Sequence, residues 1–486
     1  MNVGRRAVHG TVYLAVTRQF TQVYYFATSI ILARLLDPAQ FGTIGLAIII
    51  FSFISRARLF GFNYVLISKS EAEPRVISTH FLLQAGLTAI VVGATFLLRP
   101  VLLIYYEPQV INVLVVVAVL SLFDAEGLAA TAYALITKEL RFKELSLFDV
   151  LVQVSAPLVA IGLAYYGFGV WALVARQAWE TLINFILYWY ASPWKPWHGL
   201  DFDWDAGREY WAQGKHLWVS GFSTFIVFGY DDLLVGSWSG AAALGYYNRA
   251  YNFSKLPMSF LGSIMQVAYP TYTKAKSDPA KLSLAFNIVL SAITLISMPA
   301  SVFLAVAAPE LVVLLIGEKW LPSVPLLQLL VVYSILRPIS DVSLSLPMAM
   351  EMPAILSKIA VIQTVSMLIL CTVLTYFFEA AGAALSADVV VLMGVIIIFR
   401  AFVTRHVTVD YWELFGSPIL ATVAATMGVF VALSLVSVDL LILRLALKTV
   451  IFGLIYLSLL ILIQRENLVH KFQYIYGFLR KKNERS

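Results

Sequence analysis

The chain has 486 residues, of which 60% are hydrophobic and only 13% are charged. So few polar side chains could not cover a soluble protein of this length, and runs of about 20 apolar residues recur along it, each long enough to cross a bilayer core of about 30 Å. This predicts an all-α polytopic membrane protein and excludes a transmembrane β-barrel, whose strands would alternate apolar and polar residues. The net charge of +6 is assigned to cytoplasmic loops rather than to a nucleic-acid site.

Neither a disulfide framework nor a metal site is indicated. The single cysteine, Cys371, lies inside an apolar run, and the six histidines show no ligand spacing. We therefore expect no cofactor beyond a coupling ion, H⁺ or Na⁺. Adjacent arginines, Arg5 and Arg6, precede a first apolar run that Arg18 interrupts. This favours a cytoplasmic start to a retained helix over a cleaved signal peptide.

Taken in chain order, the apolar runs predict about fourteen membrane spans by the length criterion. They lie at residues 10–36, 40–67, 76–98, 109–136, 145–166, 169–191, 209–237, 241–270, 281–307, 322–349, 353–378, 380–404, 413–436 and 440–463. With the N-terminus inside, nearly all loop lysines and arginines fall on the cytoplasmic side, and the outside loops carry only Arg99 and Lys319. An even number of spans with both termini cytoplasmic is predicted.

The longest internal loop, residues 192–207, is rich in Pro, Gly and Trp and suits a linker between two lobes. The predicted organisation follows from it: an N-lobe at residues 1–192, a linker at 193–208, a C-lobe at 209–406, two further helices at 407–464, and a basic tail at 465–486. An internal repeat supports two related halves. Aligned without gaps, Asp37 falls on Gly240 and Gly42 on Gly245, an offset of 203 residues. Six spans in each half give both halves the same orientation in the membrane.

Charged residues lie inside many of these spans, where each costs at least about 2.5–3.5 kcal/mol on insertion scales and therefore calls for a reason. Arg18, Arg56, Asp124 and Lys255 have no obvious partner on their own helix, which favours a functional role. The bases predicted to line a substrate cavity are Arg18, Arg56, Arg249, Lys255 and Arg337. The acids predicted to act in coupling or gating are Asp124, Glu180, Asp231, Asp232 and Asp341.

Structural interpretations of these charges stay open. Arg337 and Asp341 are four residues apart and can form an intrahelical pair, as Glu180 can with Arg176. Arg58 can extend toward the cytoplasmic surface along its apolar stem.

A second structural alternative concerns the turn between the seventh and eighth spans. Asp231, Asp232 and Arg249 lie at similar depth on the two spans, so they can pair across them.

The excess of bases over acids points to an anionic substrate. A guanidinium binds phosphate in a bidentate manner, and a lysine binds it as a point charge. The acids can instead carry coupling ions, because a desolvated carboxylate can titrate near neutrality. Tyr246, Tyr247 and Tyr251 lie near these charges and offer rings for stacking on sugars.

Two motifs carry a family resemblance. The sequences ILARLLDPAQFG (residues 31–42) and LVGSWSGAAALGYYNRAYNFSKLP (residues 234–257), with about fourteen spans, resemble the polysaccharide transporter family, the Wzx-type flippases of lipid-linked oligosaccharides. This family belongs to the multidrug/oligosaccharidyl-lipid/polysaccharide exporter superfamily. The resemblance implies two six-helix lobes around a central cavity, followed by two additional helices. It also implies that a polyprenyl-pyrophosphate-linked oligosaccharide is moved by alternating access from the inner to the outer leaflet of a bacterial inner membrane. Membrane lipids and polysaccharide polymerase or export machinery are the implied partners.

Rival functions remain at this stage. A multidrug or cation antiporter of the same superfamily would favour acids and aromatics in its cavity, against the basic excess here. A flippase of the lipid-linked peptidoglycan precursor is a closer rival, because its cavity is also basic. A membrane enzyme acting on lipid-linked sugars would need a sizeable external loop, and none is predicted, so we expect a transporter rather than an enzyme. A non-transporting scaffold would gain nothing from so many buried charges.

Overall fold

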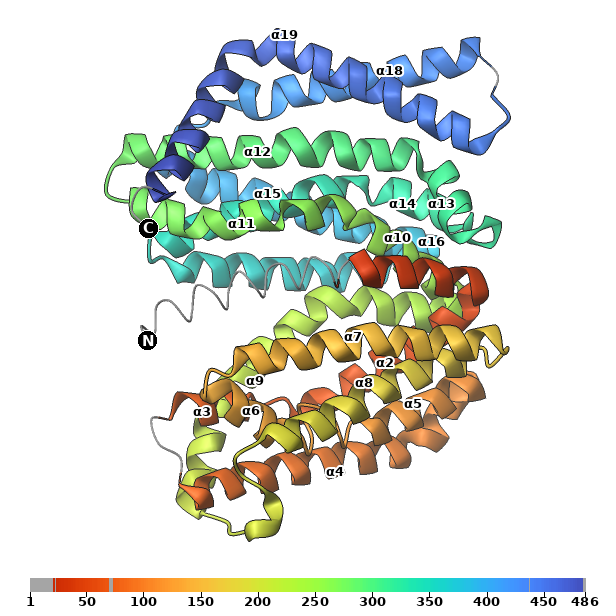
Figure 1. Ribbon diagram of the computed structural model, residues 1–486, viewed down its shortest axis with the longest axis vertical. Coiled ribbons are helices and arrows are strands. Elements are labelled where there is room, and N and C mark those ends of the chain that lie inside the picture. The colour runs from red at the N-terminus through yellow and green to blue at the C-terminus, as the bar shows by residue number, and fades with distance from the viewer. Residues whose placement is uncertain (1–20, 22, 70–72, 437, 484–486) are drawn as a thin grey trace. The chain divides into compact units, whose positions relative to one another are not determined.

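The computed structural model describes residues 21, 23–69, 73–436 and 438–483, and these residues form helices joined by short turns, with no strand among them (Figure 1). The predicted all-α class is confirmed. The chain divides into two compact units between Gly245 and Tyr246.

The first unit is built from long helices with short helical segments between them. It contains the helical residues Val23–Leu35, α2 (Pro38–Ser55), η1 (Arg56–Arg58), α3 (Phe62–Ser68), α4 (Pro74–Tyr105), α5 (Pro108–Leu120), α6 (Ala130–Lys138), α7 (Phe142–Tyr165), α8 (Val170–Ala191), η2 (Pro196–His198), α9 (Trp204–Leu234), the π-helical turn η3 (Val235–Ser239) and the start of α10 (Gly240–Ser254). Proline stands at the first position of α2, α4 and α5, where its missing N–H has no intrahelical partner to lose.

The second unit continues in the same manner. It contains the rest of α10, α11 (Leu256–Ala275), α12 (Pro279–Val306), α13 (Ala308–Ile316), η4 (Glu318–Trp320), α14 (Ser323–Leu329), α15 (Val331–Ala349), α16 (Pro353–Ile398), η5 (Phe399–Val403), α17 (Thr404–His406), η6 (Trp412–Gly416), α18 (Ser417–Leu435) and α19 (Leu441–Asn483). The last two long helices, α18 and α19, lie side by side (Figure 1).

Seven helices among the described residues are long and apolar enough to cross a bilayer, or eight if the bent pair α14–α15 is one span. One of the seven segments, Ala354–His406, has 53 residues and so has the length for two crossings. It is divided at Glu379, whose backbone leaves the helical region with φ 52°, at the residue between the predicted spans 353–378 and 380–404. The chain is a multi-pass membrane protein, and the total of about fourteen spans stays a prediction.

Four predicted spans are broken rather than continuous, which is a correction to the hydropathy pattern. The second span breaks after Ser55, and its chain turns through Gly61 at φ 68° before α3 begins. The fourth span breaks between Leu120 and Ala130. The eighth breaks at Lys255, and the tenth bends by 42° between α14 and α15. Three of these breaks carry the charged residues Arg56, Arg58, Asp124 and Lys255, which the sequence analysis placed inside continuous spans.

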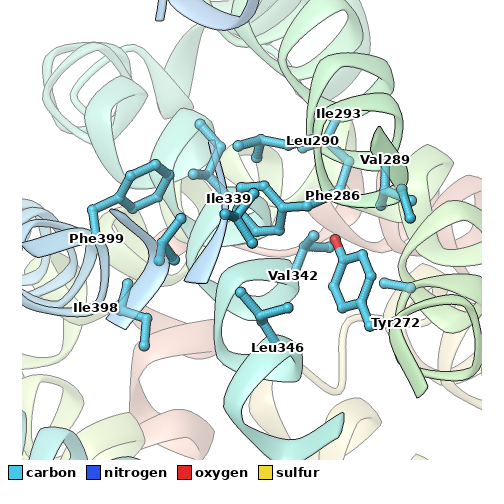
Figure 2. Close-up of a cluster of buried hydrophobic side chains, with 14 of the residues drawn as sticks. Tyr272, Phe286, Val289, Leu290, Ile293, Ile339, Val342, Leu346, Ile398 and Phe399 are labelled. Carbon is cyan, nitrogen blue, oxygen red and sulfur yellow. The ribbon is translucent and has the colours of Figure 1, made fainter. Parts of the chain in front are cut away.

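Each unit has its own buried side-chain clusters. In the second unit, Phe286 of α12 packs near Phe399 at the start of η5, with 6.3 Å between ring centroids, and Ile339 of α15 joins them (Figure 2). Lipid tails are as apolar as these side chains, so inside a bilayer the cluster is held by close van der Waals contact.

The predicted boundary between the two lobes lies at the linker of residues 193–208, ahead of α9. Helix α9, which corresponds to the seventh predicted span, packs on α2, α3 and α4 and so belongs to the first compact unit. The predicted linker at residues 193–208 connects α8 to α9 within that unit. The division at this linker stays a prediction.

Candidate functional site

A buried arginine joins the two broken spans of the first unit. Arg58 ends η1, and its side chain is only 4% exposed. Its Nη2 donates to Oδ2 of Asp124 at 2.5 Å, and its Nη1 donates to Oδ1 of Asp124 at 3.2 Å and to the Ser121 carbonyl at 2.9 Å. Ser121 caps the C-terminus of α5, so the guanidinium also lies where the helix dipole favours a cation.

This contact bears on two sequence expectations. The Arg58 side chain is buried in an ion pair instead of extending toward the surface, and Asp124, for which no partner on its own helix was expected, has its partner on another span. The turn between α5 and α6 makes the pairing possible, because it exposes the Ser121 carbonyl and carries Asp124, whose Oδ1 also accepts the Glu126 backbone N–H. The arrangement is a structural ion pair, and a coupling or gating role for Asp124 stays a prediction.

Two further predicted residues of the first unit also have local partners. Oε1 of Glu180 accepts a hydrogen bond from Nε of Arg176 at 2.9 Å on α8, which confirms the intrahelical pair. The Arg176 guanidinium also lies 4.7 Å from the centre of the Tyr25 ring. Arg56 is half-buried, and its carbonyl accepts Nε1–H of Trp218 on α9 at 2.6 Å. The Arg56 backbone therefore fixes the break between α2 and α3 against α9.

The remaining predictions for the first unit are only partly tested. Asp231 is buried and Asp232 is half-buried on the last turn of α9. Their predicted pairing with Arg249 stays a prediction, because Arg249 belongs to the second unit. Arg18 lies outside the described residues.

Two glycines at equivalent points of the internal repeat allow a close backbone contact. A Cβ atom added to Gly42 would lie 1.5 Å from the Ala241 carbonyl oxygen, and one added to Gly245 would lie 2.1 Å from the Pro38 carbonyl oxygen. The offset of 203 residues relates Pro38 to Ala241 and Gly42 to Gly245, so each turn packs on the other in the same way. This reciprocal contact supports the predicted duplication, and only glycine fits at both positions.

In the second unit, a lysine and two tyrosines form a contact between α10 and α15. The ammonium of Lys255, at the break between α10 and α11, lies 3.9 Å from the centre of the Tyr251 ring. The Tyr251 hydroxyl donates to the Tyr333 hydroxyl at 2.8 Å. The lysine ammonium is a point charge that can attract an anion, and the tyrosine rings offer apolar faces with hydroxyls at their edges.

The other two predicted bases of the second unit are also held in place. Arg337 follows Tyr333 by one turn of α15 and so lies on the same helix face. It pairs with Asp341 on that helix at 3.2 Å, and both side chains are 24% exposed, which confirms the intrahelical pair. Arg249 lies 5.3 Å from the ring of Trp320, which is fully buried. We call Lys255, Tyr251, Tyr333 and Arg337 the basic–aromatic cluster.

An acid from another helix supports this cluster. Oδ1 of Asp388, on α16, accepts the Tyr333 backbone N–H at 2.7 Å. Tyr333 is the third residue of α15, and no side chain at the start of α15 caps its first turn. The Asp388 carboxylate therefore caps this backbone N–H from α16. Sequence reasoning missed Tyr333 as a site residue, although its place one turn before Arg337 was a usable signal.

A group of charges near the C-terminal helices was also missed. The Glu310 carboxylate on α13 is buried and forms two ion pairs with side chains of α19. Nζ of Lys448 lies 2.7 Å from it and Nε of Arg444 lies 3.0 Å from it. Nζ of Lys448 also donates to the Val306 carbonyl at 2.8 Å. These contacts fasten α19 to the end of α12 and to α13. Within the described residues no group of three or more His, Cys, Asp or Glu side chains is arranged to hold a metal ion.

This polytopic helical fold is that of a multi-pass membrane protein. Residues 31–325 match the family described as polysaccharide biosynthesis protein, and the chain belongs to that family.

Curated relatives agree with the family. The chain is 27% identical over 342 residues to the lipopolysaccharide biosynthesis protein WzxC of Escherichia coli (strain K12), covering 69% of this chain and 68% of that protein. It is 27% identical to the teichuronic acid biosynthesis protein TuaB of Bacillus subtilis (strain 168), covering 57% of each. It is 22% identical to the succinoglycan biosynthesis transport protein ExoT of Rhizobium meliloti (strain 1021), covering 63% of this chain and 61% of that protein. The match thus spans less than two thirds of TuaB and ExoT.

Solved structures share the fold. The lipid II flippase MurJ in an inward closed conformation superposes with a TM-score of 0.75 at 13% identity, covering 94% of this chain and 100% of that one. An inward-facing multidrug resistance MATE family transporter of the MOP superfamily superposes with a TM-score of 0.55 at 14% identity, covering 78% and 94%. The predicted superfamily is confirmed by the family match and the fold together.

Proposed function

We propose that the protein is a flippase that moves a polyprenyl-pyrophosphate-linked oligosaccharide from the inner to the outer leaflet of the bacterial inner membrane, for surface polysaccharide biosynthesis. Family membership supports this, as do the names of WzxC, TuaB and ExoT. The proposed protein is a transporter and not an enzyme. It acts by alternating access between two lobes around a central cavity, with both termini cytoplasmic and with H⁺ or Na⁺ as the coupling ion.

The basic–aromatic cluster is the observation that carries the proposal. Lys255 and Arg337 supply positive charge for a pyrophosphate, and Tyr251 and Tyr333 supply ring faces and hydroxyls for the first sugars. The lipid tail would stay in the bilayer. Arg18, Arg56 and Arg249 are proposed to extend this basic surface, and membrane lipids and polysaccharide polymerase or export machinery are proposed partners.

The acids have separate proposed roles. Asp341 and Glu180 keep the neighbouring guanidinium groups in fixed orientations, since each forms an ion pair on its own helix. Asp231 and Asp232 are proposed to act at the gate and Asp124 in coupling between the broken spans of the first unit.

Leaflet-resolved detection of the lipid-linked oligosaccharide tests the function. Cells that lack the protein should accumulate this lipid on the cytoplasmic face, and the native gene should restore it to the outer face. Loss of sugar synthesis, or of polymerisation on the outer face, would favour the alternative of a membrane enzyme acting on lipid-linked sugars. Export of small cations with no effect on the lipid would favour an ion-coupled multidrug antiporter.

The same assay tests the cluster. The double variant Lys255→Gln/Arg337→Gln should abolish transfer to the outer face while the protein remains in the membrane. Lys358→Gln is the matched control, because Lys358 is an exposed lysine on α16 outside the cluster. Normal transfer by the double variant at wild-type abundance would refute the assignment.

A further inference from the structure

A cleft outside the basic–aromatic cluster lies where α12 begins and the chain leaves α17. Its volume is about 670 Å³, and its lining includes Ser283, Arg405, His406, Thr408 and Tyr411. This volume falls within the range of about 300–1,000 Å³ that is typical of small-molecule sites. It is larger than a bare oxyanion needs.

Hydrogen bonds and packing join the two walls of the cleft. The Thr408 backbone N–H donates to Oγ of Ser283 at 3.1 Å, and Nδ2 of Asn287 donates to the Thr408 carbonyl at 2.7 Å. Val407, which lines the cleft, is buried in the same cluster as Phe286 and Phe399. The linker after α17 is therefore bound along α12 by both hydrogen bonds and packing.

The donors in the cleft suit a phosphate group. Arg405 is exposed and forms no ion pair within the described part of the chain, so its planar guanidinium is available for two phosphate oxygens. Nδ1 of His406 donates to the Phe402 carbonyl at 2.9 Å, so Nε2 of the neutral imidazole is an acceptor and suits a hydroxyl of the ligand. The exposed hydroxyls of Thr408 and Tyr411 can serve further oxygens.

Acids close to the cleft have other partners. Asp278 caps α12 by accepting the backbone N–H groups of Ala280 and Lys281, and its carboxylate pairs with Nζ of Lys281 at 2.8 Å. The Asp410 carboxylate accepts the Glu413 backbone N–H. The start of α12 is thus already capped, and Arg405 supplies the positive charge of the cleft.

We propose that this cleft binds the phosphate of a glycerol phosphate ester, supplied either by an anionic phospholipid headgroup at the membrane surface or by a soluble ester. The predicted topology places the loop after the twelfth span on the cytoplasmic side, where both sources are available. The site is separate from the basic–aromatic cluster and does not depend on the proposed transport function.

Two binding measurements on the full-length protein distinguish the sources. In nanodiscs of phosphatidylcholine doped with phosphatidylglycerol, native mass spectrometry counts the anionic lipid that the protein retains. In nanodiscs of phosphatidylcholine alone, calorimetric titration with glycerol phosphate measures binding of the soluble ester. Retained lipid identifies the headgroup, and heat of binding in the second measurement identifies the soluble ester.

Variants decide whether either ligand occupies this cleft. Arg405→Gln should weaken binding about tenfold or more, as loss of a charge-assisted hydrogen-bonding group does, and Tyr411→Phe should weaken it less while removing only a hydroxyl. Arg400→Gln is the matched control, because Arg400 is an exposed arginine on the preceding turn that does not line the cleft. Binding of neither probe, or equal losses in the Arg405 and Arg400 variants, would overturn the proposal.

Discussion

Removing either partner of the Arg58–Asp124 pair should destabilise the protein unequally. Asp124→Ala leaves the Arg58 guanidinium unpaired with only 4% of its side chain exposed, whereas Arg58→Ala leaves an Asp124 side chain that is 32% exposed and can reach water. Removing one partner of a buried pair costs about 3–5 kcal/mol, and we expect Asp124→Ala to fall in that range. Arg58→Ala should cost only about 1.5–3 kcal/mol, the worth of its charged hydrogen bonds.

The measurement is reversible unfolding in mixed micelles, followed by circular dichroism, for both single variants and the double variant. The double variant should be less destabilised than the sum of the singles, because the pair interacts directly. Arg176→Ala serves as the control, since its pair with Glu180 is partly exposed on one helix and should cost only about 0.3–0.5 kcal/mol. Equal losses in the two single variants, or additivity within about 0.5 kcal/mol, would refute the reasoning.

Three further outcomes are expected. Gly42→Ala should force α2 and α10 apart and lower the thermal unfolding midpoint, whereas Gly86→Ala, where a Cβ meets nothing within 4 Å, should leave it unchanged or raised. Glu310→Gln should leave the Lys448 ammonium buried without its carboxylate and lower the free energy of unfolding by about 3 kcal/mol. Backbone hydrogen exchange in α19 should become faster, and exchange at the wild-type rate would contradict this. Cys371 is fully buried, so a maleimide should label it in denatured but not in native protein, and rapid native labelling would show that α16 opens.

Much of the fold was predictable because membrane spans are long and uniformly apolar. The ends of α7, α8, α12 and α18 lie within a few residues of the predicted spans, and the break at Glu379 falls between two of them. The breaks inside spans were not predictable, because they depend on tertiary partners. Arg58 and Ser121 are 63 residues apart, and nothing local shows that one binds the carbonyl that the other exposes.

The site was predictable at the level of residue type. Buried bases and acids are rare enough in membrane spans to be found by position alone, and the pairs Arg176–Glu180 and Arg337–Asp341 follow from spacing. Partners on other helices escaped, as with the Asp388 carboxylate at the start of α15. So did the charges of α19, because Glu310 lies on a short helix that the span pattern treated as a loop.

The reciprocal contact between Gly42 and Gly245 restricts how the two halves of this chain can diverge. In a duplicated protein each copy is ordinarily free to drift under the demands of its own surroundings. Here the surroundings of one copy are the backbone of the other, because each glycine faces a carbonyl at the equivalent point of the opposite repeat. A larger residue in either half is therefore opposed by main chain, which no side-chain substitution elsewhere can remove. Both halves are therefore restricted to glycine at this point, even where the rest of their sequences have diverged.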